Sequence, residues 1–175
     1  MTIKHAAFSE QIKMNEMEKG DKRFGIAIGY GENHKIPADT TDLFSFTSLK
    51  VSLGKRVSTK VENLIEVSYT KLSEIEDNSA VWLSFGHRRY LKVSPRTALG
   101  VQFNFGVMSF KHKVAELGTN TNFTEQLGLV YDYVVSEKNT LSLEYKFSHI
   151  SNAHMKLPNV GINASMISLG YNWYY

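Results

Sequence analysis

The chain has 175 residues, of which 42% are hydrophobic and 12% aromatic, a composition that fits one ordered domain rather than a disordered segment. It contains no cysteine, which excludes a disulfide framework and any cysteine-based metal site or nucleophile. The formal net charge of +3 suits an anionic partner, but it is also typical of an ordinary solvated surface. No apolar run approaches the roughly 20 residues of a spanning helix, so the chain can cross a bilayer only as a closed barrel.

The first 22 residues form a polar lead-in to the rest of the chain. If this segment is structured, we expect it to be helical. The stretch from Met1 to Gly20 lacks the basic, apolar and small-residue regions of a secretory signal. If the remainder is a membrane barrel, we expect that the signal was removed or lies upstream of the recorded start.

From Arg23 onward, apolar and polar residues alternate, as they do in strands that have one apolar and one polar face. There are eight such segments, at 24–30, 43–53, 65–70, 81–86, 99–107, 127–133, 141–148 and 167–175. The fifth is the clearest, with its apolar row formed by Leu99, Val101, Phe103, Phe105 and Val107. An even number of strands of about this length is typical of single-chain outer-membrane barrels.

The connections alternate in length as well. Those at 58–61, 94–97 and 136–139 are short, whereas those at 32–42, 74–79, 112–123 and 152–161 are mostly longer. Outer-membrane barrels have short turns at the periplasmic rim and long loops outside. We therefore predict an all-β fold, an eight-stranded antiparallel transmembrane β-barrel of outer-membrane type over residues 23–175, in the bacterial outer membrane.

A soluble barrel of the lipocalin type alternates equally well but turns its apolar face inward. Two features favour the membrane barrel. The polar rows carry charges and amides that can pair inside a narrow lumen: Lys50, Glu66, Gln102, Asn104, Asp132, Glu144 and Lys146. Tyrosine and tryptophan also gather at strand ends, as in an aromatic girdle: Tyr30, Tyr171, Trp173, Tyr174 and Tyr175. We expect Phe103 and Tyr145 to face lipid.

His149 and Ser151 end the seventh segment. Two residues apart on a strand, they lie on one face about 6 to 7 Å apart, from where the imidazole can reach the hydroxyl as a general base. They continue the apolar row that contains Tyr145 and Phe147, so they should point at lipid near the outer rim. A polar pair on that face is costly, and a substrate embedded in the outer leaflet would explain it. Alternatively, both are ordinary polar residues where a strand ends and a loop opens.

The stretch from Phe147 to Asn163 resembles the signature of the lipid A 3-O-deacylase (PagL) family. The matching residues are His149, Ser151, Asn152, Ala153, Pro158, Asn159 and Gly161. The resemblance implies an eight-stranded outer-membrane barrel with a Ser-His-Glu triad on its outer wall. It gives Ser151 the role of nucleophile and His149 that of general base. Asn159 matches an asparagine near the oxyanion site, and Asn152 and the backbone around Ala153 are further candidate donors, although both asparagines can equally be loop residues.

The sequence departs from this family at two positions. The triad acid falls at Asn163, whose amide can orient an imidazole but carries no charge. His154 stands where the family often has glycine, and a bulky residue there can crowd the oxyanion loop.

The leading hypothesis is thus a serine esterase that removes an ester-linked acyl chain from lipid A, the lipid anchor of lipopolysaccharide, without a metal or cofactor and without a nucleic-acid partner. The alternatives are a non-catalytic outer-membrane barrel with a structural or adhesion role and, third, a soluble lipid-binding barrel. Two basic clusters, at 87–89 and 111–113, are more typical of interface anchors than of sites, although Lys111 and Lys113 are candidates to contact lipid A phosphates.

Overall fold

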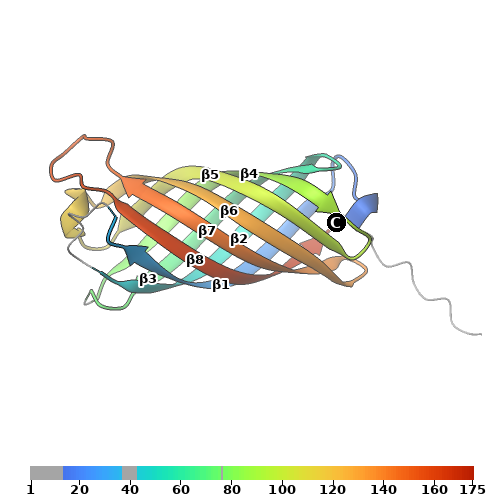
Figure 1. Cartoon of the computed structure of the whole chain (residues 1–175), viewed down its shortest axis with the longest axis horizontal. Helices are drawn as coiled ribbons and strands as arrows, with labels where there is room; N and C mark the ends of the chain where they lie inside the picture. The colour runs from blue at the N-terminus through green and yellow to red at the C-terminus, as the bar shows by residue number, and fades with distance from the viewer. Residues whose placement is uncertain (1–13, 37–42, 76) are drawn as a thin grey trace, which may run out of the picture.

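The chain folds into one closed antiparallel barrel, as predicted (Figure 1). A computed structural model describes residues 14–36, 43–75 and 77–175, apart from the side chain of residue 15. Each strand pairs with the next, and the last pairs with the first. The strands are β1 (Lys22–His34), β2 (Ser45–Ser58), β3 (Val61–Leu72), β4 (Ser79–Val93), β5 (Thr97–Phe110), β6 (Thr121–Ser136), β7 (Asn139–Ser151) and β8 (Ile162–Tyr174).

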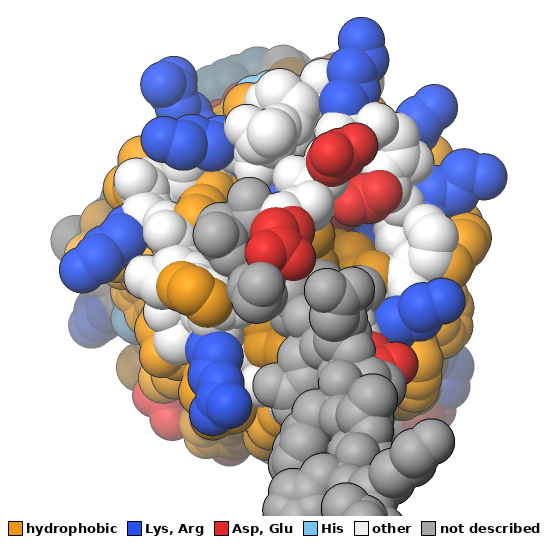
Figure 2. Space-filling view, turned by 90° about the vertical axis from the view of Figure 1, so that its right-hand side faces the viewer, with side chains coloured by type: hydrophobic (Ala, Val, Ile, Leu, Met, Phe, Trp, Pro, Cys, Tyr) orange, Lys and Arg blue, Asp and Glu red, His pale blue; other side chains and the backbone are white. Residues whose placement is uncertain are grey.

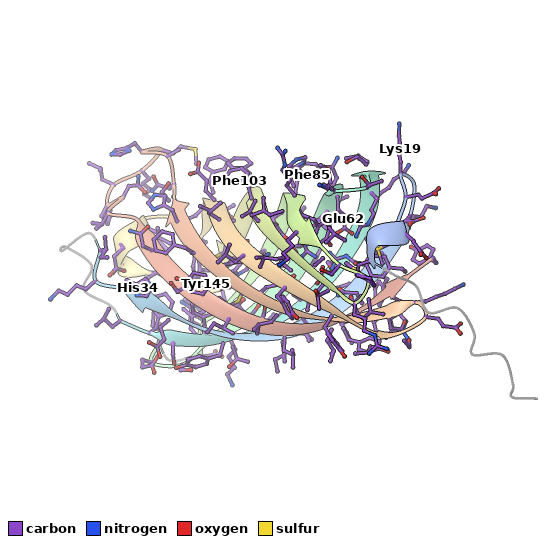
Figure 3. The ribbon with its side chains drawn as sticks, turned by 45° about the vertical axis from the view of Figure 1, so that its right-hand side comes forward. Lys19, His34, Glu62, Phe85, Phe103 and Tyr145 are labelled. Carbon is purple, nitrogen blue, oxygen red and sulfur yellow. The ribbon has the colours of Figure 1, made fainter. Side chains whose placement is uncertain are left out.

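The apolar rows face outward, which confirms the membrane orientation. Phe103 and Tyr145 are 50% and 44% exposed, and both point away from the barrel axis (Figure 3). Polar residues on the alternate rows are buried in the lumen. Such a barrel places its apolar surface in lipid, and a soluble lipocalin-like barrel is excluded because it would place that surface inside. Among the described residues, no helix is long and apolar enough to span a membrane.

The inward charges form a paired network, as expected for ions held out of water. Arg88 donates to Glu144 over 2.8 Å and lies 3.5 Å from Asp132. Lys146 contacts Glu66 over 2.6 Å. The prediction that the basic cluster at 87–89 anchors the barrel at the interface is therefore wrong for its central residue, Arg88. Alternation along the strand turns the Arg88 side chain inward, where it is fully buried.

The two ends of the barrel differ. The short turns lie at the end that holds both described termini, and the longer connections lie at the other, as predicted (Figure 1). Figure 2 shows the short-turn end, with lysine and arginine side chains around its edge. Each of the three short turns contributes one exposed basic side chain, namely Lys60, Arg96 and Lys138.

The short 3-10 helix η1 (Met14–Glu16) lies at the short-turn end of the barrel (Figure 1). Met14 and Met17 pack into a buried cluster with Tyr90 and Tyr174. The assignment of Tyr174 to the aromatic girdle is thus wrong, since its even position turns it into the lumen, where it is 4% exposed. The neighbouring Trp173 does lie on the outer face. The part of the expected lead-in before residue 14 lies outside the described residues.

The long-loop end of the lumen is filled by an apolar cluster that the sequence analysis did not anticipate. Its buried members come from six strands, from the 3-10 helix η2 (Ala115–Leu117) and from the residues just before β2 and η2: Phe44, Phe46, Leu72, Ala80, Trp82, Met108, Phe110, Val114, Leu117, Ile150, Ile162, Ala164 and Met166. Ile150 and Ile162 pair across β7 and β8, so β8 begins earlier than the expected residue 167. This cluster gives the outer wall at the end of β7 a rigid backing.

Candidate active site

The His149 and Ser151 side chains lie on the outer row of β7 at the long-loop end. The burial pattern of the strand alternates up to this point, with Tyr145 and Phe147 exposed and Ser148 and Ile150 buried. His149 and Ser151 are both half-buried on the outward row. The pair therefore faces the membrane near the rim rather than the lumen.

Asn163 lies directly across from His149 on β8. Its Oδ1 is 2.8 Å from Nδ1 of His149, and its Nδ2 donates to the backbone carbonyl of Ile36 over 2.5 Å. Only the amide nitrogen can donate to that carbonyl, so Ile36 fixes which way the amide of Asn163 points. Its oxygen then requires that Nδ1 of His149 carry a proton, so the neutral imidazole has its lone pair on Nε2. A general base needs this tautomer.

Ser151 keeps a free hydroxyl. Within the part of the chain that the structure describes, the Ser151 side chain makes no hydrogen bond, neither to His149 nor to another group. The hydroxyl and Nε2 thus share one face without being engaged elsewhere. Catalytic hydrogen bonds are often long in an empty site and tighten when substrate binds.

Gly161 lies next to the Cε1–Nε2 edge of the His149 imidazole, a contact that the sequence motif does not predict. Its φ of +82° lies in the left-handed region, where glycine is favoured. A Cβ at this position would lie 2.9 Å from Cε1 and 3.6 Å from Nε2 of His149. The imidazole therefore occupies the space that a side chain would take.

Asn152 is fully buried and holds the loop that follows Ser151. Its Nδ2 donates to the carbonyls of Leu117 and Lys156, each over 2.6 Å, and its backbone N–H donates to Oδ1 of Asn159 over 2.9 Å. Both protons of the side-chain amide are engaged in these contacts. They favour a structural role for the Asn152 side chain over a direct contact with substrate.

The loop next to Ser151 offers other donors. Ala153 and His154 adopt left-handed conformations, with φ of +52° and +61°, and both are exposed. Among the described hydrogen bonds, none uses the backbone N–H of either residue. Nδ2 of Asn159 lies 3.3 Å from Nδ1 of His154. The left-handed φ at position 154 explains physically why glycine suits it, since a β-carbon is strained there.

The row through His149 continues onto two further strands, which the sequence analysis did not connect with it. Glu125 on β6 is the cross-strand partner of His149, and His34 on β1 is the partner of Asn163. His34 also contacts Ser165, with Nε2 2.8 Å from Oγ. Strand register brings these residues together, and a single sequence carries no direct signal of register.

The basic residues near the outer rim are partly neutralised. Lys111 forms an ion pair with Asp77, and both side chains are well exposed. The hydrogen bond and the charge of Lys111 lower the pKa of the Asp77 carboxyl below its ordinary range. Lys111 therefore meets an anionic headgroup only in competition with Asp77. Among the described residues, no group of three histidine or acidic side chains could hold a metal ion.

A closed eight-stranded barrel with an apolar outer wall defines a small protein of the bacterial outer membrane. The family model described as "Lipid A 3-O-deacylase (PagL)" matches residues 43–172, and the chain belongs to this family.

Solved structures of outer-membrane proteins share the fold. Neisserial surface protein A (NspA) has a TM-score of 0.69 and 9% identity, covering 90% of this chain and 100% of that chain. The outer membrane enzyme PagL has a TM-score of 0.64 and 16% identity, covering 85% and 98%. The attachment invasion locus protein Ail of Yersinia pestis has a TM-score of 0.55 and 12% identity, covering 90% and 99%. At these identities the likeness concerns the fold alone. No curated protein matches the sequence.

Proposed function

We propose that this protein is a serine esterase that removes an ester-linked acyl chain from lipid A in the outer leaflet. The observation that carries the proposal is the contact between His149 and Asn163, which leaves Nε2 of the imidazole free on the face that also holds Ser151. Membership of the lipid A 3-O-deacylase family supports lipid A as the substrate. The placement of the pair on the lipid-facing wall fits a substrate that stays in the membrane.

In the proposed reaction, Oγ of Ser151 attacks the ester carbonyl while its proton moves to Nε2 of His149. The tetrahedral intermediate collapses by breaking the bond to the sugar oxygen, which takes the proton back from Nε2. Water then attacks the acyl-enzyme with the same base, releasing the fatty acid and restoring Ser151. The backbone N–H groups of Ala153 and His154 and the amide of Asn159 are the candidate donors to the oxyanion.

Asn163 acts in this scheme by orienting His149 rather than by supplying charge. Its amide oxygen fixes the tautomer but does not neutralise the imidazolium that forms during each step. In serine proteases the loss of the acid lowers the rate by about 10⁴. Part of that loss comes from the wrong tautomer, which the Ile36 carbonyl prevents here.

The test is mass spectrometry of lipid A from cells that express the chain. Wild type should yield lipid A lighter by one acyl chain, and Ser151→Ala and His149→Ala should not. Heat-modifiable gel mobility should show that all three barrels assemble. Unmodified lipid A from cells with assembled wild-type barrel would contradict the proposal.

A non-catalytic barrel is the second candidate, and the neutral Asn163 is the observation that favours it. Some proteins of similar fold are named for surface location or attachment, such as neisserial surface protein A and Ail. If this candidate is correct, lipid A remains unmodified, and Ser151→Ala changes neither assembly nor lipid A.

A further inference from the structure

One row of outward side chains crosses four strands through the candidate base. Antiparallel register pairs Glu125 on β6 with His149 on β7, His149 with Asn163 on β8, and Asn163 with His34 on β1. Directly opposed residues on neighbouring strands have Cβ atoms about 5 Å apart. His149 thus lies between an amide on one side and a carboxylate on the other.

The outward residues next to Glu125 on β5 and β6 are apolar. Its partner on the opposite side, on β5, is Phe105, and the outward residues before and after it on β6 are Phe123 and Leu127. The side chain is exposed, and among the described residues it has no hydrogen bond or ion pair. Of the two residues directly opposite Glu125 on β5 and β7, His149 is therefore the polar one. An unpaired carboxylate on a lipid-facing row is unfavourable and calls for a reason.

We infer that Glu125 supplies the negative charge that Asn163 lacks, so that the two functions of a triad acid are divided between two strands. Asn163 orients the imidazole from β8, and the carboxylate of Glu125 stabilises the imidazolium from β6. This inference rests on the proposed function. Glu125 is a positioning residue in this scheme, because it acts through His149 and does not contact the reacting ester.

The geometry allows this division without blocking the base. Nδ1 of His149 is held by Asn163 on the β8 side, and the ring tip lies over Gly161. A carboxylate on the β6 side can interact with the imidazolium through space and leave Nε2 to Ser151. Charges about 6 Å apart interact strongly at the effective dielectric constant of a protein surface, and lipid on the outer side screens them less than water does.

The test is the isosteric change Glu125→Gln. We expect kcat to fall by about tenfold to a hundredfold with little change in KM, because the lost attraction exists only while His149 is charged. The acidic limb of the pH–rate profile should move to lower pH. Among the described residues, the other titratable neighbours of His149 by register and loop position are His34 and His154, which are unchanged in the variant. Glu125→Asp should retain part of the rate.

A double-mutant cycle separates charge from structure. In the Asn163→Glu background a carboxylate already faces His149 from β8, so Glu125→Gln should cost much less there than in wild type. The matched control is Glu32→Gln, which removes the same charge from the same outer wall. By register, Glu32 lies two strands and two residues from His149, about 12 Å away, and its loss should leave the rate unchanged.

The outcomes distinguish the two proposals. If wild type cleaves lipid A and Glu125→Gln keeps its rate and pH profile, the inference about Glu125 is wrong while the proposed function stands. Equal losses in both backgrounds would also overturn it, because they would indicate a structural effect. If assembled wild type is inactive, both the proposed function and the role of Glu125 are wrong.

Discussion

Replacing Gly161 by alanine tests whether activity depends on the space that Gly161 leaves for the His149 imidazole. The added Cβ would lie 2.9 Å from Cε1 of His149, whereas carbon atoms in contact are about 3.5 Å apart. The ring must therefore move by roughly 0.5 Å, away from the position in which Nδ1 lies 2.8 Å from Asn163. A displacement of about 1 Å in a catalytic group can cost a hundredfold in rate.

We expect Gly161→Ala to lower kcat/KM for lipid A deacylation by about tenfold or more. The free energy of unfolding should fall by only about 1 to 2 kcal/mol, the cost of a β-carbon at a left-handed φ. Kinetics with purified lipid A in detergent would give the first quantity, and urea titration of the refolded barrel would give the second.

Gly20→Ala is the matched control. Gly20 has a φ of +108°, and an added Cβ there meets nothing within 4 Å, so this variant carries backbone strain without a clash. It should lose stability but keep its activity. Wild-type kinetics in Gly161→Ala would refute the idea that the glycine makes room for the imidazole, and an equal loss in Gly20→Ala would attribute the effect to strain.

Three further predictions concern charge. In the Glu125→Gln background, Asn163→Glu should raise kcat, measured on purified lipid A, by placing a carboxylate beside the His149 imidazolium, and an unchanged or lower rate in an assembled barrel would contradict this. Arg88→Met should destabilise the barrel by about 3 to 5 kcal/mol in urea titration, because it leaves buried carboxylates without their cation, and a neutral result would show that the network tolerates its loss. Lys111 lowers the pKa of Asp77, so the pair is intact above that lowered pKa and is lost as pH falls through it. In Lys111→Gln the Asp77 carboxyl, followed by NMR, should titrate at higher pH than in wild type, and an unchanged titration would exclude the ion pair.

The alternating rows could be predicted from the sequence because side-chain direction along a strand has a period of two and is a local property. That period placed Phe103 and Tyr145 outward and the charged rows inward. For two residues the predicted location was wrong, although the alternation of the sequence was enough to place them correctly. Arg88 and Tyr174 both occupy inward positions by the same alternation, whereas composition, which assigns them to a basic cluster and an aromatic girdle, does not distinguish the two faces of a strand.

The sequence by itself thus determined the fold class, the membrane orientation of its faces and the position of His149 and Ser151 on one outward row. Only the tertiary structure decided which groups surround that pair. The Ile36 carbonyl that fixes Asn163, the space over Gly161 and the carboxylate of Glu125 all come from other strands or loops. Their proximity depends on strand register, and register is set by pairing between distant segments and by closure of the whole barrel.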